Sequence, residues 1–124
     1  MQMLFQWDMS QQEPAKLEAK FWREAKAADA TRAFANSLFE GAVKQTAALD
    51  EIIDRHASNW RLERLAAIDR AILRLAIYEM RKMDTPPKVV LNEAVELAKT
   101  FSSEEAGGFV NGVLDAAHKS LQIK

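Results

Sequence analysis

The two histidines are the side chains of this chain best suited to metal binding or to proton transfer near neutral pH. His56 and His118 lie far apart in the sequence, and neither belongs to an H-E-x-x-H motif or a comparable spacing. The chain has no cysteine, which excludes a disulfide framework and any thiolate metal site. We therefore expect structural or surface histidines and no metal.

The carboxylates and glycines suggest no catalytic arrangement either. Glu93, Glu96 and Lys99 share one helical face, as do many exposed ion-pairing triplets. The pair at 107–108 is an isolated Gly-Gly, and no phosphate-binding glycine motif occurs. An enzyme needs a nucleophile, a positioned acid–base pair or a metal. The sequence thus predicts a protein that is not an enzyme and needs no cofactor.

Length and composition predict one domain over residues 1–124. The chain has 124 residues, of which 48% are hydrophobic, and only four glycines and three prolines. That length allows one real core but not two. No apolar run approaches the roughly 20 residues that span a bilayer, and the N-terminus does not read as a secretory signal. We expect a cytoplasmic protein that does not bind membranes.

Positive charge is concentrated in the middle of the chain. The net charge is −1 overall, yet residues 61–88 carry seven Lys and Arg against four Asp and Glu, an excess of three. A surface that binds nucleic acid usually has a larger excess. Charge alone therefore favours solvated helix faces over a strong phosphate-binding surface.

Hydrophobic periodicity predicts an all-α, compact bundle of about six or seven helices. Apolar residues at steps of three and four from Phe34 to His56 predict one long helix that reaches about Ala57. Gly41 lies in its middle, where glycine costs about 1 kcal/mol relative to alanine. The expected reason is the close approach of a neighbouring helix.

The second half of the chain predicts a central helix followed by two more. Residues 62–80 are apolar around so much of the helix, Leu75 included, that several neighbours should cover it. The prolines at 86–87 start the next helix, which should turn Phe101 inward. Ser102 and Glu105 match a capping box at the start of the last helix.

Two strings in this half match a known signature. Residues 88–101 read K-V-V-L-N-E-A-V-E-L-A-K-x-F, and residues 109–115 read F-V-N-G-V-L-D. Residues 4–7, 38–50 and 68–79 agree as well, in the same order. Over nearly its whole length the chain resembles the NusB family of bacterial transcription antitermination proteins.

The resemblance implies an all-helical RNA-binding factor. Members of that family bind the boxA element of ribosomal RNA leader transcripts together with NusE, a small-subunit ribosomal protein. The complex helps RNA polymerase to read through terminators, without a cofactor or a chemical step. The expected partners are therefore boxA RNA, NusE and the RNA polymerase antitermination complex.

The matched positions indicate which residues are expected to bind RNA and which are expected to bind the partner. Phe5 is expected as an aromatic at the end of the first helix, suited to base stacking or to a partner, with a core role as the alternative. Asp69 and Arg70 interrupt the apolar stripe and should face water or a partner. The residues expected to bind RNA are Gln2, Phe5, Arg70 and Phe109, and those expected to bind the partner are Phe5, Asp69, Phe101 and Glu105.

One departure from the family pattern concerns the first helix. An arginine-rich stretch normally leads into it, whereas this sequence starts at the expected middle of that helix. A late start site, a trimmed chain or weak RNA affinity would each account for this. Two alternatives stay open: a helical scaffold or homodimer without RNA, and a relative of the N-terminal domain of ribosomal RNA cytosine methyltransferases.

Overall fold

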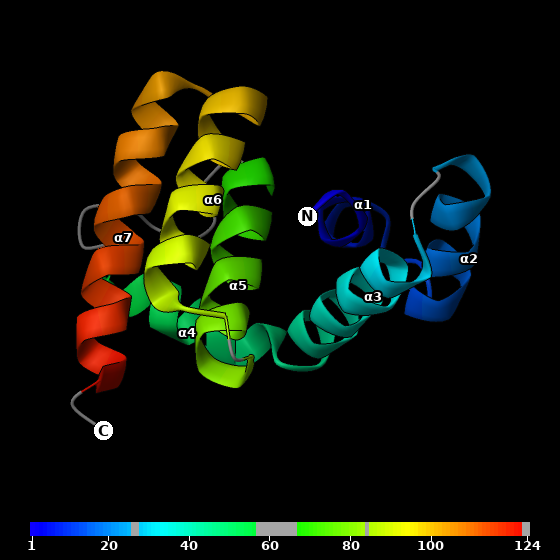
Figure 1. Ribbon diagram of the computed structural model, residues 1–124, viewed down its shortest axis with the longest axis horizontal. Helices are drawn as coiled ribbons and strands as arrows, with labels where there is room; N and C mark the ends of the chain where they lie inside the picture. Colours follow the sequence, from blue (N-terminus) through cyan, green and yellow to red (C-terminus); the bar gives the residue numbers. More distant parts are fainter. Residues whose placement is uncertain (26–27, 57–66, 84, 123–124) are drawn as a thin grey trace.

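The computed structural model describes residues 1–25, 28–56, 67–83 and 85–122, and in these ranges it contains seven α-helices and no strand. This confirms the predicted all-α bundle (Figure 1). The helices are α1 (Gln2–Ser10), α2 (Pro14–Glu24), α3 (Asp29–Lys44), α4 (Thr46–His56), α5 (Ala67–Lys82), α6 (Pro87–Phe101) and α7 (Glu104–Gln122).

Helix α5 occupies the centre, as its apolar circumference predicts, and residues 62–66 of the predicted helix lie outside the described residues. It packs against α1, α3, α4, α6 and α7, while α6 packs most extensively on α7. Figure 1 shows α5, α6 and α7 side by side at one end of the molecule, with α2 and α3 at the other. Helix α1 lies between these two groups, so it connects both ends.

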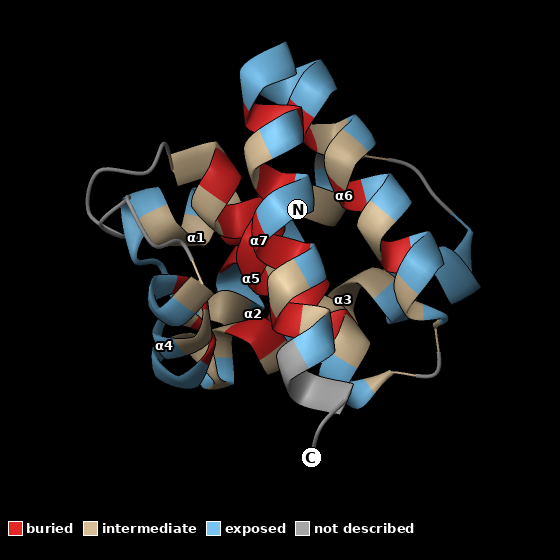
Figure 2. Cartoon of the chain, turned by 90° about the vertical axis from the view of Figure 1, so that its left-hand side faces the viewer, coloured by how far each residue is buried: buried red, intermediate tan, exposed pale blue. Residues whose placement is uncertain are grey.

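One continuous hydrophobic core holds the helices together. Figure 2 shows the buried residues on the faces that the helices turn toward one another, with exposed residues outside. Leu4, Phe39, Ile53, Leu73 and Leu114 are among its fully buried side chains, and each comes from a different helix. Burial of such side chains is the main favourable contribution to the folding free energy.

The prediction of one long helix that reaches about Ala57 is wrong, and Ala57 itself lies outside the described residues. Helix α3 ends at Lys44 and α4 begins at Thr46, with Gln45 outside helical geometry at φ −109° and ψ 18°. The Thr46 hydroxyl donates to the carbonyls of Ala42 and Val43, at 2.9 and 3.0 Å, so it satisfies groups at the end of α3. Both halves are amphipathic, and periodicity alone does not show that the chain turns between them.

The close approach predicted at Gly41 is confirmed. Tyr78 of α5 lies against this glycine, so that a Cβ placed there would be 2.6 Å from Tyr78 Cε1 and would overlap the hydroxyl end of the ring. The absence of a side chain at Gly41 therefore lets α3 pack closely on α5.

The capping box predicted at Ser102 is shifted by one residue. Ser103 caps α7, because its Oγ accepts a hydrogen bond of 3.0 Å from the Ala106 N–H. Ser102 instead lies at the end of α6. The residue three positions after the cap is Ala106, so Glu105 cannot complete a box and remains exposed.

Helices α2 and α3 bring two carboxyl groups together. The Glu18 side chain meets that of Glu40, and its Oε2 is buried without a hydrogen-bond partner. Burial, and then the hydrogen bond and negative charge of Glu40, raise the pKa of Glu18 to about 7. One of the two carboxyl groups therefore keeps a proton well above the usual pH range of a glutamate.

Replacing Leu73 by alanine tests the register of α5. Leu73 is fully buried, whereas Leu75, which the sequence also placed in the core, is only half-buried. Leu73→Ala should lower the free energy of unfolding by about 2–5 kcal/mol, because it leaves a cavity. Lys82→Ala, at an exposed position of the same helix, should change it by less than about 0.5 kcal/mol. Equal urea midpoints for the two variants would contradict this register.

Replacing Glu18 by glutamine tests the shared proton. Because folding raises the pKa of Glu18, the pair contributes stability that is complete below the ordinary pKa of 4.5 and is lost as pH rises through about 7. Glu18→Gln keeps a hydrogen-bond donor without a titrating proton. This variant should therefore unfold at higher urea concentration than the wild type at about pH 8, with little difference at about pH 4. Glu13→Gln, at the exposed N-cap position before α2, is the control, and an unchanged pH profile in Glu18→Gln would exclude the shared proton.

Candidate binding surface

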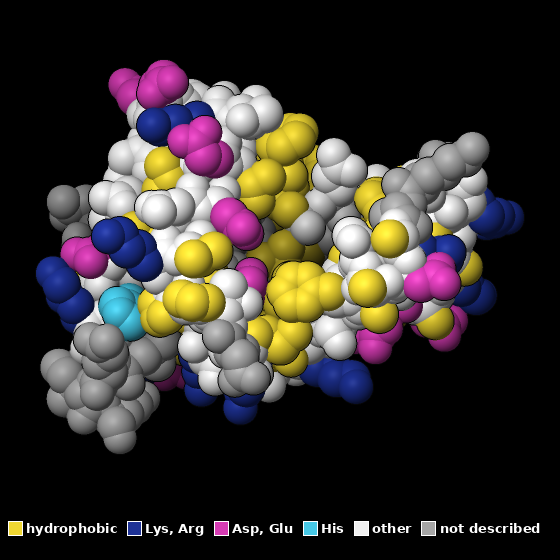
Figure 3. Space-filling view, in the orientation of Figure 1, with side chains coloured by type: hydrophobic (Ala, Val, Ile, Leu, Met, Phe, Trp, Pro, Cys, Tyr) yellow, Lys and Arg dark blue, Asp and Glu magenta, His cyan; other side chains and the backbone are white. Residues whose placement is uncertain are grey.

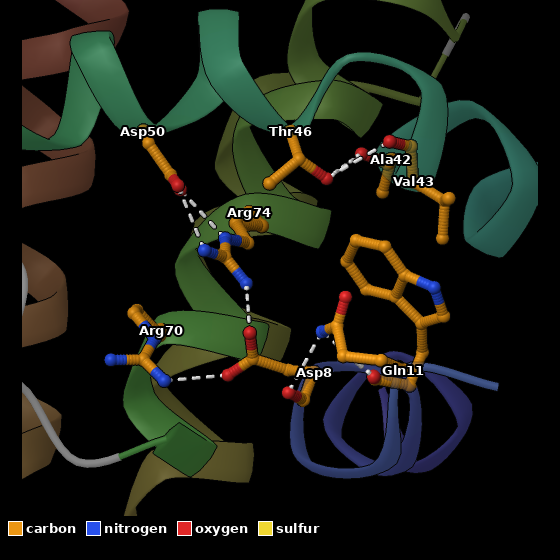
Figure 4. Close-up of polar contacts among 9 residues, drawn as sticks. Asp8, Gln11, Ala42, Val43, Thr46, Asp50, Arg70 and Arg74 are labelled. Carbon is orange, nitrogen blue, oxygen red and sulfur yellow. Dashed lines mark hydrogen bonds and ion pairs between the residues drawn. The ribbon is translucent and has the colours of Figure 1, made fainter.

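A network of ion pairs fixes α1 against the centre of the molecule. Arg74 of α5 is only 5% exposed, and its Nε and Nη2 donate to the Asp50 carboxylate of α4 at 2.6 and 2.8 Å. Its Nη1 donates to Asp8 Oδ1 of α1 at 3.1 Å. Arg70, one turn earlier, donates to Asp8 Oδ2 at 2.6 Å (Figure 4). Three helices thus meet at two guanidinium groups.

The network keeps its members charged. Burial by itself would raise the pKa of Asp8, but the hydrogen bonds and positive charges of Arg70 and Arg74 outweigh it and hold that pKa below its ordinary value. Burial likewise acts to lower the pKa of Arg74, and Asp50 and Asp8 outweigh it and raise the pKa. Each buried charge therefore has a hydrogen-bonded counter-charge, the condition under which burial of ions is tolerated.

The sequence predicted that Arg70 faces water or a partner, but most of its side chain is covered. Its side chain is 20% exposed, its Nη2 binds Asp8, and its Nε is buried without a hydrogen-bond partner. Only part of this guanidinium remains accessible to a ligand.

Asp69 is buried, which contradicts the expectation that it faces water or a partner. It is 9% exposed, and its Oδ1 has no hydrogen-bond partner. Burial raises the pKa of Asp69, while a hydrogen bond with the Ser102 side chain acts against this rise. Asp69 thus connects α5 to the turn between α6 and α7, and this tertiary contact covers it.

Two of the residues expected to bind the partner are exposed around the turn between α6 and α7. Phe101, the last residue of α6, is 47% exposed, so its predicted inward orientation is wrong. Glu105 is exposed in the first turn of α7. Phe109 follows four residues later on the same face of α7 and is half-buried against the core.

Residues of α1 reach the same region. Gln2 is exposed and lines a hollow of about 260 Å³ together with Phe101. Phe5 is half-buried and packs against the hydrophobic core, so its ring is only partly accessible. The fold therefore brings Gln2 close to Phe101, and Asp69 close to Ser102, from segments far apart in the sequence.

Sequence reasoning missed Asp8, Asp50 and Arg74 as members of a network. A signal was present: Arg74 interrupts a helix that is apolar on most sides, and a charge in a covered helix requires a partner. Which carboxylates meet it depends on how α1 and α4 pack, and that is a tertiary property.

Two further observations concern the described ranges. Within them, no group of three or more His, Asp or Glu side chains could hold a metal ion. The helices in the same ranges include none that is long and apolar enough to cross a membrane.

The seven helices of the described ranges pack around one core, with Phe101 and Glu105 exposed at helix ends, and define an all-helical protein. The sequence profile of the NusB family matches residues 1–119. The chain therefore belongs to the NusB family of transcription antitermination proteins.

Individual relatives agree with this assignment. The transcription antitermination protein NusB of Koribacter versatilis (strain Ellin345) is 46% identical over 126 residues, which cover 100% of this chain and 86% of the relative. The structure of T. maritima NusB is 34% identical, covers 95% of this chain and 84% of its own, and superposes with a TM-score of 0.82. A crystal structure of antitermination factors NusB and NusE in complex with double-stranded RNA is 34% identical, covers 95% and 89%, and has a TM-score of 0.81.

Replacing Asp8 by asparagine tests the network. The change removes one carboxylate from two guanidinium groups and should lower the free energy of unfolding by about 1.5–3 kcal/mol at neutral pH. Because folding lowers the pKa of Asp8, its contribution is present above the unfolded pKa of about 4 and is lost as pH falls through the folded value. Urea unfolding at pH 7 and below pH 4 measures both effects, with exposed Asp54→Asn as the control. A loss that persisted unchanged at low pH would argue against the ion pairs.

Proposed function

We propose that this chain is an RNA-binding transcription antitermination factor that binds boxA of ribosomal RNA leader transcripts together with NusE. The observation that carries the proposal is the likeness in sequence and fold to the NusB chain of the complex with NusE and double-stranded RNA. The proposed activity is binding, without catalysis or a cofactor, by one domain in the cytoplasm as part of the RNA polymerase antitermination complex.

We propose that NusE contacts the turn between α6 and α7. Phe101 supports this role because its large apolar ring is 47% exposed, and aromatic anchors dominate the energy of many interfaces. Glu105 supports it because its carboxylate is exposed and takes no part in capping the helix. Asp69 is buried beneath the turn, so its proposed contribution is to hold Ser102 in place.

The proposed RNA contacts are Gln2, Phe5, Arg70 and Phe109. A stacked base contributes about 1–3 kcal/mol where an aromatic face is free, but Phe5 and Phe109 are half-buried and present only part of their rings. Arg70 shares its charge with Asp8. With a net charge of −1, these contacts support weak binding by the chain alone and tighter, boxA-selective binding with NusE.

Titration of NusE against single variants tests the partner surface. Phe101→Ala should weaken NusE binding by about tenfold, the effect of losing a moderate aromatic anchor. Glu105→Gln removes an exposed charge and should weaken it by a few fold at low salt. Isothermal calorimetry measures both, and circular dichroism verifies folding. Glu13→Gln, at the exposed N-cap position before α2, should bind like the wild type, whereas unchanged affinity in both turn variants would remove this interface.

The RNA assignment is tested with the same preparation. In a gel shift, the mixture with NusE should retain boxA RNA at concentrations where a scrambled RNA of equal length stays free. Equal retention of the two RNAs would show that binding is non-specific and would overturn the proposed function.

A further inference from the structure

Four exposed cations lie where α3 and α5 end and α6 begins. Lys44 is the last residue of α3, Arg81 and Lys82 are the last two residues of α5, and Lys88 is the second residue of α6. All four are exposed, and we call this surface the basic edge. Figure 3 shows Lys and Arg side chains along the lower side of the molecule, where Figure 1 places the ends of α3 and α5.

Tertiary packing brings Lys44 to the other three cations. Gly41 of α3 lies against Tyr78 of α5, so these helices touch about one turn before each of them ends. Figure 1 shows both helices finishing on the same side of the molecule. The short connection from α5 to α6 contains one acidic residue, Asp84, which lies outside the described residues. Residues 81–88 thus carry three cations against one anion.

The basic edge is not neutralised by carboxylates that the structure describes. None of its four side chains forms an ion pair with a described residue. Exposed cations elsewhere do form such pairs, for example Lys16 with Glu13 and Lys119 with Asp115. The positive charge of the basic edge therefore remains available to an anion.

Helix dipoles account for only part of this charge. A cation in the last turn of a helix is favourable, which applies to Lys44, Arg81 and Lys82. Lys88 lies in the first turn of α6, where the dipole disfavours a cation, and that turn has no acidic residue. A charge that is unfavourable for its own helix indicates an anionic ligand.

The residue types favour a phosphate backbone over an acidic protein as that ligand. Three of the four cations are lysines, which are depleted at protein–protein interfaces but common in contacts with nucleic-acid phosphates. Protein interfaces also depend on large buried anchors, most often aromatic ones. Val89, which is 43% exposed, is the large apolar residue next to the basic edge in the sequence, and it is not aromatic.

We propose that the basic edge binds the phosphodiester backbone of the transcript beside boxA. Arg81 lies eleven residues after Arg70 on α5, about 16 Å farther along the helix axis, so this site is separate from the proposed RNA contacts. Four cations give only a weak, sequence-independent attraction. The proposal rests on the proposed function, because a transcript already held at boxA has a high local concentration and a weak second contact then adds affinity.

RNAs with and without tails measure this contribution. The complex of the full chain with NusE is titrated by fluorescence anisotropy with boxA RNA, with boxA carrying a uridine tail on each side, and with the tailed RNA after boxA is scrambled. The tailed boxA RNA should bind about three- to tenfold more tightly than boxA alone. Its affinity should also fall more steeply with salt, because each added phosphate contact contributes about 0.7 to the slope of log K against log salt.

Matched variants locate the site. The basic-edge variant removes one arginine and two lysines: Arg81→Gln, Lys82→Gln, Lys88→Gln. The control variant removes the same residue types from exposed positions of α2: Lys16→Gln, Lys20→Gln, Arg23→Gln. The basic-edge variant should abolish the gain from the tails and lower the salt slope by about 2, with unchanged affinity for boxA alone. Lys44→Gln should lower the slope by about 0.7, and the control should bind like the wild type. Circular dichroism verifies folding.

Three outcomes would overturn the proposal: tails that add no affinity, equal losses in the basic-edge and control variants, and an unchanged salt slope in the basic-edge variant. A polyglutamate peptide that displaced the tails more readily than polyuridine of equal charge would assign the basic edge to an acidic protein segment instead. Equal binding of the tailed boxA and scrambled RNAs would overturn the proposed function. The effect of the variants on the scrambled tailed RNA at low salt would still decide whether the basic edge binds RNA.

Discussion

The Arg74 guanidinium is the group on which much of this structure depends. It is almost completely buried, and a buried cation is tolerated only when carboxylates surround it. Asp50 comes to it from α4 and Asp8 from α1, so the charge is compensated only when both helices pack on α5. Apolar contacts would allow these helices some choice of register, whereas a hydrogen-bonded guanidinium fixes their direction and spacing.

Fixing α1 has consequences for the surface. Helix α1 is short and lies between the two ends of the molecule (Figure 1), where it contacts α2, α3 and α5. Leu4 enters the core from it, while Gln2 stays exposed beside Phe101. The ion pairs of Asp8 at the other end of the helix hold this arrangement in place. The candidate binding surface therefore depends on a buried network that does not itself have to touch RNA or a partner.

Charge divides the surface of the protein into different regions. Glu93 and Glu96 are exposed on α6 and make that face acidic, which disfavours RNA there. Arg70 contributes positive charge near α1, but Asp8 neutralises much of it. A chain with net charge −1 thus has little electrostatic attraction for RNA of its own, which is why the proposed function requires NusE.

The sequence by itself determined the fold class, the central position of α5 and the close approach at Gly41. The fold class and the place of α5 follow from local rules, because apolar periodicity and proline positions act through neighbouring residues. A glycine within a helical pattern indicates that another helix can approach there, without showing which one. The matched strings also determined the family. Only the structure shows that the chain turns at Gln45 and that Ser103 rather than Ser102 caps α7, although the hydrogen bonds at both places are local. Tertiary structure alone decided that Asp69 is buried while Phe101 is exposed. Whether a side chain faces water or a neighbour is decided by which helix covers it, and one helix's periodicity does not contain that information.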